Sequence, residues 1–152
     1  MVVPFDKILD AVAEQTVDAG LIIHEGQLTY GKSGFHNVID LGRWWKSEYD
    51  LPLPLGGNVL LRSLSDEVKS ECCRIMRESI QYALDHGEES LNYAMQFARD
   101  LEPRLAEKFV GMYVNHFTVD CGELVPQAAQ KLLDMGYEAG LISKKVTVEF
   151  VR

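Results

Sequence analysis

A short run of prolines and glycines near the middle of the chain constrains the fold more than any other feature. Residues 51–57 read LPLPLGG. Proline has no backbone N–H to donate, and its ring clashes with the preceding helical turn, so this run fits neither a regular helix nor a central strand. We therefore predict an extended connector over residues 51–57, which separates a region of short apolar runs from a region of helical patterns.

The region before the connector alternates apolar runs with a helical pattern. Met1–Val3 is typical of the end of a strand, and the spacing of apolar residues predicts a helix over Pro4–Glu14. Residues 18–23 (DAGLII) form an apolar run after a turn signal, which predicts a buried strand. The order strand, helix, strand predicts a parallel βαβ unit. Three further elements are expected before the connector: a loop over Gly26–Gly34, a strand at Val38–Ile39 and a helix over Leu41–Tyr49.

The region after the connector is predicted to be mostly helical. Ser65 is a favourable N-cap, followed by two acidic residues, and the helix it begins should end near His86, with Gly87 as a left-handed cap. The remaining expected elements are strands at Val59–Leu61 and Val146–Phe150, and helices over Leu91–Ala98, from Pro103 to Tyr113, and from about Glu123 to Met135 with Gly136 as its stop.

His24 is the candidate catalytic residue. It follows the apolar run at 18–23 directly, and ligands of open parallel sheets bind at the carboxyl ends of the strands. Histidine side chains exchange protons near neutral pH, so a histidine at this position is suited to act as a general base. The structural alternative is a histidine that is hydrogen-bonded to the backbone at the end of a strand.

Four further residues are candidates for substrate binding, and three of them have a structural alternative. Glu25 could act as a second acid–base group or simply orient His24. Tyr30, in the expected loop, could donate a hydrogen bond to a ligand. Gly56 and Gly57 would let the backbone approach a ligand closely, or would simply form a bend between two lobes.

Composition excludes several classes of function. The net charge of −8 argues against a broad nucleic-acid interface, which needs clustered lysine and arginine. No apolar run approaches the roughly 20 residues of a membrane span, and no basic leader precedes an apolar stretch, which predicts a cytoplasmic location. The three cysteines have no framework spacing, and the histidines match no common zinc motif, so we expect no metal and no disulfide.

Several stretches of the chain resemble the 1,4-dihydroxy-6-naphthoate synthase family of the futalosine route to menaquinone. The specific parts are GLIIHEGQ (residues 20–27) and LPLPLGG (residues 51–57), and FVGMYVN (109–115) and TVDCGE (118–123) add to them. The similarity runs from Pro4 to about Ile142. It implies an α/β fold of the type II periplasmic-binding-protein kind, with two lobes around a cleft.

The resemblance also implies how the chain is divided. Family members are nearly twice as long, so this chain corresponds to the C-terminal half. On that basis we expect residues 1–56 to finish the second lobe and residues 57–152 to return to the first. Apolar faces would then lack their cover, so we expect either a complementary N-terminal half or a homo-oligomer.

The implied activity is that of a carbon–carbon lyase. The family converts cyclic dehypoxanthine futalosine to 1,4-dihydroxy-6-naphthoate and releases a three-carbon sugar fragment, with the histidine of the GLIIHEGQ motif, here His24, as the proposed base. The resemblance implies no metal, flavin or nicotinamide cofactor. Two alternatives remain open: a solute-binding domain without catalysis, and a subunit that needs a separate N-terminal chain.

Overall fold

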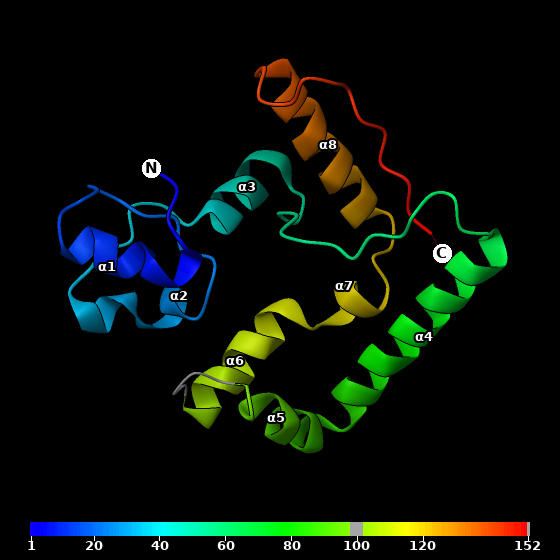
Figure 1. The fold of residues 1–152 in the computed structure, drawn as a ribbon, viewed down its shortest axis with the longest axis horizontal. Coiled ribbons are helices and arrows are strands. Elements are labelled where there is room, and N and C mark those ends of the chain that lie inside the picture. Colours follow the sequence, from blue (N-terminus) through cyan, green and yellow to red (C-terminus); the bar gives the residue numbers. More distant parts are fainter. Residues whose placement is uncertain (98–101, 152) are drawn as a thin grey trace. The chain divides into compact units, whose positions relative to one another are not determined.

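The computed structural model describes residues 1–97 and 102–151, and in these residues it is helical, with no strand (Figure 1). The expected α/β two-lobe fold is therefore wrong for this chain as it stands. The physical reason is that a strand exists only as one member of a ladder, because its backbone N–H and C=O groups need a neighbouring strand. In the described residues, the runs expected to be strands have no regular secondary structure instead.

The helical elements begin and end as follows, in chain order: η1 (Phe5–Lys7), α1 (Ile8–Ala13), α2 (Gly26–Thr29), η2 (Tyr30–Ser33), α3 (Leu41–Tyr49), α4 (Asp66–Asp85), α5 (Gly87–Met95), α6 (Pro103–Tyr113), α7 (His116–Val119) and α8 (Leu124–Glu138). Within the described residues, no helix is both long and apolar enough to cross a membrane.

The chain divides into two compact units. Unit 1 comprises Met1–Val38 and Leu91–Met112, and unit 2 comprises Ile39–Ser90 and Tyr113–Arg152. Each unit is therefore assembled from two separate stretches of sequence. The predicted assignment of residues 1–56 and 57–152 to two lobes concerns a longer protein and stays a prediction.

Unit 1 is organised around α1. Ala11 is buried, and the Thr16 hydroxyl donates a 2.9 Å hydrogen bond to the Ala11 carbonyl, which turns the chain back after the helix. Gly20 then passes so close to Ile8 and Val12 that a side chain at residue 20 would collide with them. The irregular segment that follows is thereby held against α1 at Gly20 and leads to His24, just before α2.

Unit 2 is organised around α8 and α3. Asp40 caps α3 by accepting a hydrogen bond from the Arg43 backbone N–H at 3.0 Å. Trp45 is buried and packs against the ring of Tyr49, with 4.5 Å between the ring centroids. The ammonium of Lys131 on α8 lies 4.4 Å from the centre of the Tyr49 ring, which ties α8 to α3.

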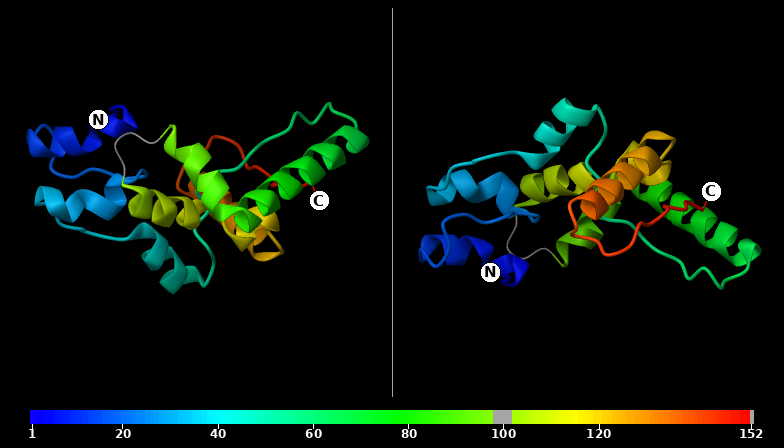
Figure 2. Two further views of the ribbon diagram at one scale, coloured as in Figure 1. Left: turned by 90° about the horizontal axis from the view of Figure 1, so that it is seen from below. Right: turned by 90° about the horizontal axis from the view of Figure 1, so that it is seen from above.

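The C-terminal segment is fixed to α8 by one amide side chain. Gln130 donates to the Val146 carbonyl at 2.8 Å and accepts from the Val148 N–H at 2.9 Å. The side chain therefore offers the segment the donor and acceptor that a neighbouring strand would have offered. Figures 1 and 2 show the segment running beside α8.

Most helix boundaries expected from local signals are confirmed. The helix over Leu41–Tyr49 and the start of a helix at Pro103 agree with α3 and α6, and Ser65 accepts from the Val68 N–H as the N-cap of α4. Residues 51–57 contain no helix, as predicted. Ala98, the expected end of another helix, lies outside the described residues.

Other local predictions are wrong. Residues 26–33 are helical (α2 and η2) rather than a loop, and Gly34 supplies the left-handed residue that ends them, with φ of +79°. Gly87 begins α5 instead of capping α4. Gly136 lies inside α8, where Ile142 packs so closely that a β-carbon would lie 2.9 Å from its Cδ1. The strands expected at 1–3, 18–23, 38–39, 59–61 and 146–150 are not formed.

Candidate functional site

The His24 side chain lies between the irregular segment that follows α1 and the start of α2, and it is mostly buried. Only 12% of its surface is exposed. Its ring contacts that of Phe5, with centroids 5.8 Å apart and planes tilted by 56°. The imidazole is therefore held by packing in unit 1 and is not a freely mobile surface group.

A backbone hydrogen bond defines the protonation of the ring. The Gly26 N–H donates to Nδ1 of His24 at 3.0 Å. A backbone amide can only donate, so Nδ1 must be the acceptor, and the single proton of the neutral ring lies on Nε2. Nε2 is buried and has no hydrogen-bond partner in the part of the chain that the structure describes. The structural alternative raised above, a histidine hydrogen-bonded to the backbone, therefore holds for Nδ1 but not for Nε2.

Gly26 also leaves the space that the ring occupies. A β-carbon at residue 26 would lie 2.5 Å from Cε1 and 3.0 Å from Nδ1 of His24, and 3.0 Å from Cδ1 of Leu9. Gly26 is itself buried. Gly26, two residues after His24, therefore both donates an N–H to the ring and leaves space for it. Sequence reasoning did not predict this role of Gly26. The motif letters HEG were the only signal available for it.

Glu25 lies beside the ring without a hydrogen bond to it. Its Oε2 is 3.8 Å from Nδ1 of His24, which is beyond hydrogen-bonding distance, and 40% of the side chain is exposed. The ion pair that this distance suggests would require a proton on Nδ1, where the Gly26 N–H already donates. We therefore regard the Gly26 bond as the interaction present in this structure and Glu25 as an unengaged neighbour.

The other predicted binding residues do not join this cluster. Tyr30 begins η2 directly after α2, where its backbone N–H donates to the Gly26 carbonyl, and it is half-buried; among the described residues, no hydrogen bond or ring contact joins its side chain to His24. Gly56 and Gly57 belong to unit 2, are exposed, and would each accept a β-carbon with no atom within 4 Å. No close backbone approach explains glycine at these two positions in this structure, so their role in substrate binding stays a prediction.

The other histidines have local structural surroundings. His86 stacks on Tyr82, with ring centroids 4.0 Å apart, and its Nδ1 lies 2.9 Å from the Tyr82 carbonyl oxygen. His116 contacts the ring of Phe117, and His36 is exposed. A search of the described residues finds no cluster of three or more histidine, cysteine or acidic side chains placed to share a metal ion.

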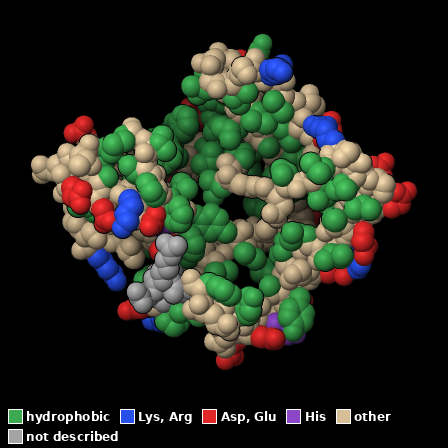
Figure 3. Space-filling view, in the orientation of Figure 1, with side chains coloured by type: hydrophobic (Ala, Val, Ile, Leu, Met, Phe, Trp, Pro, Cys, Tyr) green, Lys and Arg blue, Asp and Glu red, His purple; other side chains and the backbone are tan. Residues whose placement is uncertain are grey.

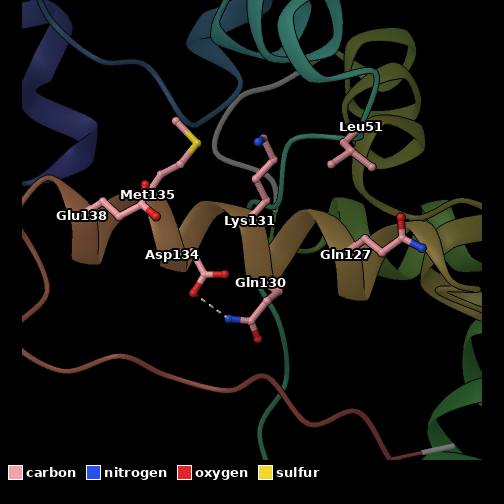
Figure 4. A pocket seen from close by; sticks show the side chains of 7 residues that line it. All are labelled: Leu51, Gln127, Gln130, Lys131, Asp134, Met135 and Glu138. Atoms are coloured by element: carbon pink, nitrogen blue, oxygen red, sulfur yellow. Dashed lines mark hydrogen bonds between the residues drawn. The ribbon is translucent and has the colours of Figure 1, made fainter.

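A pocket lies on α8 in unit 2 and is shown in Figure 4. It has a volume of about 540 Å³ and is lined by Leu51, Gln127, Gln130, Lys131, Asp134, Met135 and Glu138. Three of its polar side chains are engaged in structure: Gln130 bonds Asp134 and the C-terminal segment, and Lys131 lies over Tyr49. It holds no histidine, so His24 with its two neighbours remains the better candidate.

Comparison with known proteins agrees with the motif resemblance. The model of a family described as menaquinone biosynthesis matches residues 1–138. Two curated relatives named 1,4-dihydroxy-6-naphthoate synthase are each 38% identical. The one from Streptomyces coelicolor matches over 93% of this chain and 50% of its own length, and the one from Thermus thermophilus over 98% and 55%.

A solved structure matches as well. The crystal structure of a protein from Archaeoglobus fulgidus is 47% identical, with a TM-score of 0.87, and the match covers 92% of this chain and 53% of that one. The chain therefore spans about half the length of the relatives that it matches.

Proposed function

Because this chain belongs to the menaquinone-biosynthesis family, we propose that it forms part of a 1,4-dihydroxy-6-naphthoate synthase. The reaction would convert cyclic dehypoxanthine futalosine to 1,4-dihydroxy-6-naphthoate, with release of a three-carbon sugar fragment. The observation that carries the proposal is the His24 ring, which is mostly buried, fixed by Phe5 and Gly26, and left with one unpartnered nitrogen.

The proposed role of His24 is that of the general base. A lone pair on Nε2 would accept a proton from the substrate, the carbon–carbon bond to the sugar fragment would break, and aromatisation of the new ring would drive the reaction forward. General-base catalysis of this kind typically contributes a factor of about 10² to 10⁴ to the rate. The lone pair is free only when the ring carries its proton on Nδ1, which differs from the arrangement seen here.

The proposed enzyme also needs a partner. The chain spans about half of its relatives, and many large apolar side chains are exposed, among them Val38, Val59 and Leu61. Figure 3 shows hydrophobic side chains at the surface on one face of the chain. We propose that a polypeptide corresponding to the N-terminal half of the relatives covers these side chains and completes the substrate site, with self-association as the alternative.

A chimera tests the proposed activity directly. The first half of the T. thermophilus synthase is joined to this chain and assayed with cyclic dehypoxanthine futalosine, with the intact T. thermophilus protein as the positive control. We expect 1,4-dihydroxy-6-naphthoate to form with the chimera and not with either half alone. A folded chimera that binds the substrate without converting it would contradict the proposed activity.

That last result would support a second candidate, a solute-binding domain without catalysis. The specific observation in its favour is the bond from the Gly26 N–H to His24, because a ring whose Nδ1 is occupied and whose Nε2 is protonated can bind a ligand oxygen but cannot accept a proton from it.

A further inference from the structure

The two neighbours of His24 offer opposite partners to the same nitrogen. The Gly26 N–H donates to Nδ1 at 3.0 Å, whereas the Glu25 carboxylate, 3.8 Å from Nδ1, can only accept. The amide therefore favours a ring with its proton on Nε2, and the carboxylate favours a ring with its proton on Nδ1. These are the two neutral tautomers of histidine, and only the second has a free lone pair on Nε2.

We propose that Gly26 and Glu25 select between these tautomers. Gly26 holds the resting form, in which Nε2–H is a hydrogen-bond donor, and Glu25 stabilises the form in which Nε2 is a base. Glu25 is thus a positioning residue that acts through His24. The inference rests on the proposed function only where it names Nε2 as the base; the selection of the tautomer stands on the contacts alone.

The Glu25 carboxylate is free enough to exchange places with the Gly26 N–H as the partner of Nδ1. Glu25 is 40% exposed and no described contact fixes its carboxylate except the one with His24, so Oε2 can move the roughly 1 Å that a charge-assisted hydrogen bond to Nδ1–H requires. Because Nε2 is buried, the ring must open briefly to solvent: one proton then leaves Nε2 for water and one moves from water to Nδ1, so the charge of the ring is the same before and after. Nε2 is unpartnered in the described structure, so no protein bond opposes the loss of its proton.

Nitrogen-15 NMR of the 152-residue chain labelled at histidine tests the proposal, because the two tautomers have distinct two-bond correlation patterns. The spectrum is recorded above the pH range in which histidine rings titrate. His36, which is exposed, serves as the reference in the same spectrum. We expect His24 to favour the Nε2–H tautomer more strongly than His36, by about fivefold, as one hydrogen bond of ordinary net strength would produce.

Variants separate the two neighbours. Glu25→Gln should raise the share of the Nε2–H tautomer at His24, because it removes the anion that favours Nδ1–H. Gly26→Ala should bring His24 toward the ratio of His36, because it displaces the ring from the amide. Glu14→Gln removes an exposed carboxylate of the same unit and should leave the spectrum unchanged.

The proposal is overturned if His24 and His36 show the same tautomer ratio in the unmodified chain, or if Glu25→Gln leaves the ratio at His24 unchanged. Turnover of the chimera distinguishes this failure from failure of the proposed function. A Glu25-dependent tautomer ratio together with full turnover by His24→Ala would refute the function and leave the tautomer selection intact. If the resting ring carried its proton on Nδ1 and His24→Ala lost turnover, the tautomer selection would be refuted and the proposed function would stand.

Discussion

A β-carbon at residue 26 would lie 2.5 Å from Cε1 of His24, so Gly26 is what leaves room for the imidazole in its observed position. Gly26→Ala should therefore displace the ring. A misplacement of about 1 Å at a catalytic group can lower a rate by about 10²-fold, and overpacking a buried site typically destabilises by about 1–3 kcal/mol. We expect losses of this order in turnover of the chimera and in the free energy of unfolding.

Gly31→Ala is the matched control for that substitution. Gly31 lies in the same unit and is exposed, and an added methyl group there meets no atom within 4 Å. Turnover and stability should both stay close to those of the unmodified protein. Equal losses in Gly26→Ala and Gly31→Ala would show that the contact between Gly26 and His24 is not what matters.

Gln130→Ala should release the C-terminal segment from α8. The substitution removes both the bond to the Val146 carbonyl and the bond from the Val148 N–H. Each hydrogen bond contributes about 0.5–1.5 kcal/mol net, so we expect a loss of about 1–3 kcal/mol. Hydrogen exchange at the Val148 amide reports the release directly.

Gln127→Ala provides the comparison for Gln130→Ala. Gln127 lies one turn away on the same helix, as Figure 4 shows, and is exposed. Its removal should leave the protection of the Val148 amide unchanged. An unprotected Val148 amide in the unmodified chain would contradict the predicted role of Gln130.

Arg62 should control the titration of Glu149. The hydrogen bond from Arg62, followed by its positive charge, holds the pKa of Glu149 below its ordinary value of 4.5. The stabilisation from this pair is therefore present above pH 4.5 and is lost as the pH falls through the lowered pKa of Glu149. Carbon-13 titration of the carboxyl should show the pKa rising toward 4.5 in Arg62→Gln.

Arg77→Gln tests whether that effect is specific. Arg77 is an exposed cation on α4, and its removal changes the net charge by the same amount. The pKa of Glu149 should stay low in this variant. A rise as large as that in Arg62→Gln would show that the cause is overall charge rather than the pair.

The isolated chain should expose apolar surface that a partner covers. Val59 and Val38 are 91% and 88% exposed, and large exposed apolar surfaces mark interaction sites or aggregation. We expect binding of an apolar dye and self-association at high concentration. Adding the first half of the T. thermophilus synthase should reduce both. A monomer that binds no dye would count against the missing-half proposal.

Local signals predicted the helices well and the extended segments badly. Ser65 was predicted as the cap of α4, and its hydrogen bond depends only on a residue three positions away; Asp40 caps α3 in the same way. The run Leu21-Ile22-Ile23 has the composition of a buried strand, but strands form only against other strands, and none is present in the described chain. The segment was therefore interpreted incorrectly as a buried strand: it forms no strand, and Leu21 and Ile23 are 61% and 58% exposed.

One residue of the candidate site could be chosen from the sequence, but the geometry around it could not. His24 could be chosen from its place after an apolar run and from the motif GLIIHEGQ. The bond from the Gly26 N–H to Nδ1 could not be predicted, because residues 26–33 were expected to form a loop. It is the helical turn at α2 that points this amide back at the ring.

The most direct test of the account is turnover of cyclic dehypoxanthine futalosine by the chimera carrying His24→Ala, with His36→Ala as the control. We predict that His24→Ala lowers kcat by at least about 10²-fold, as expected for loss of a general base, while KM changes little. His36→Ala should retain the rate of the unmodified chimera. Turnover by His24→Ala at the unmodified rate would contradict the assignment of His24 as the base.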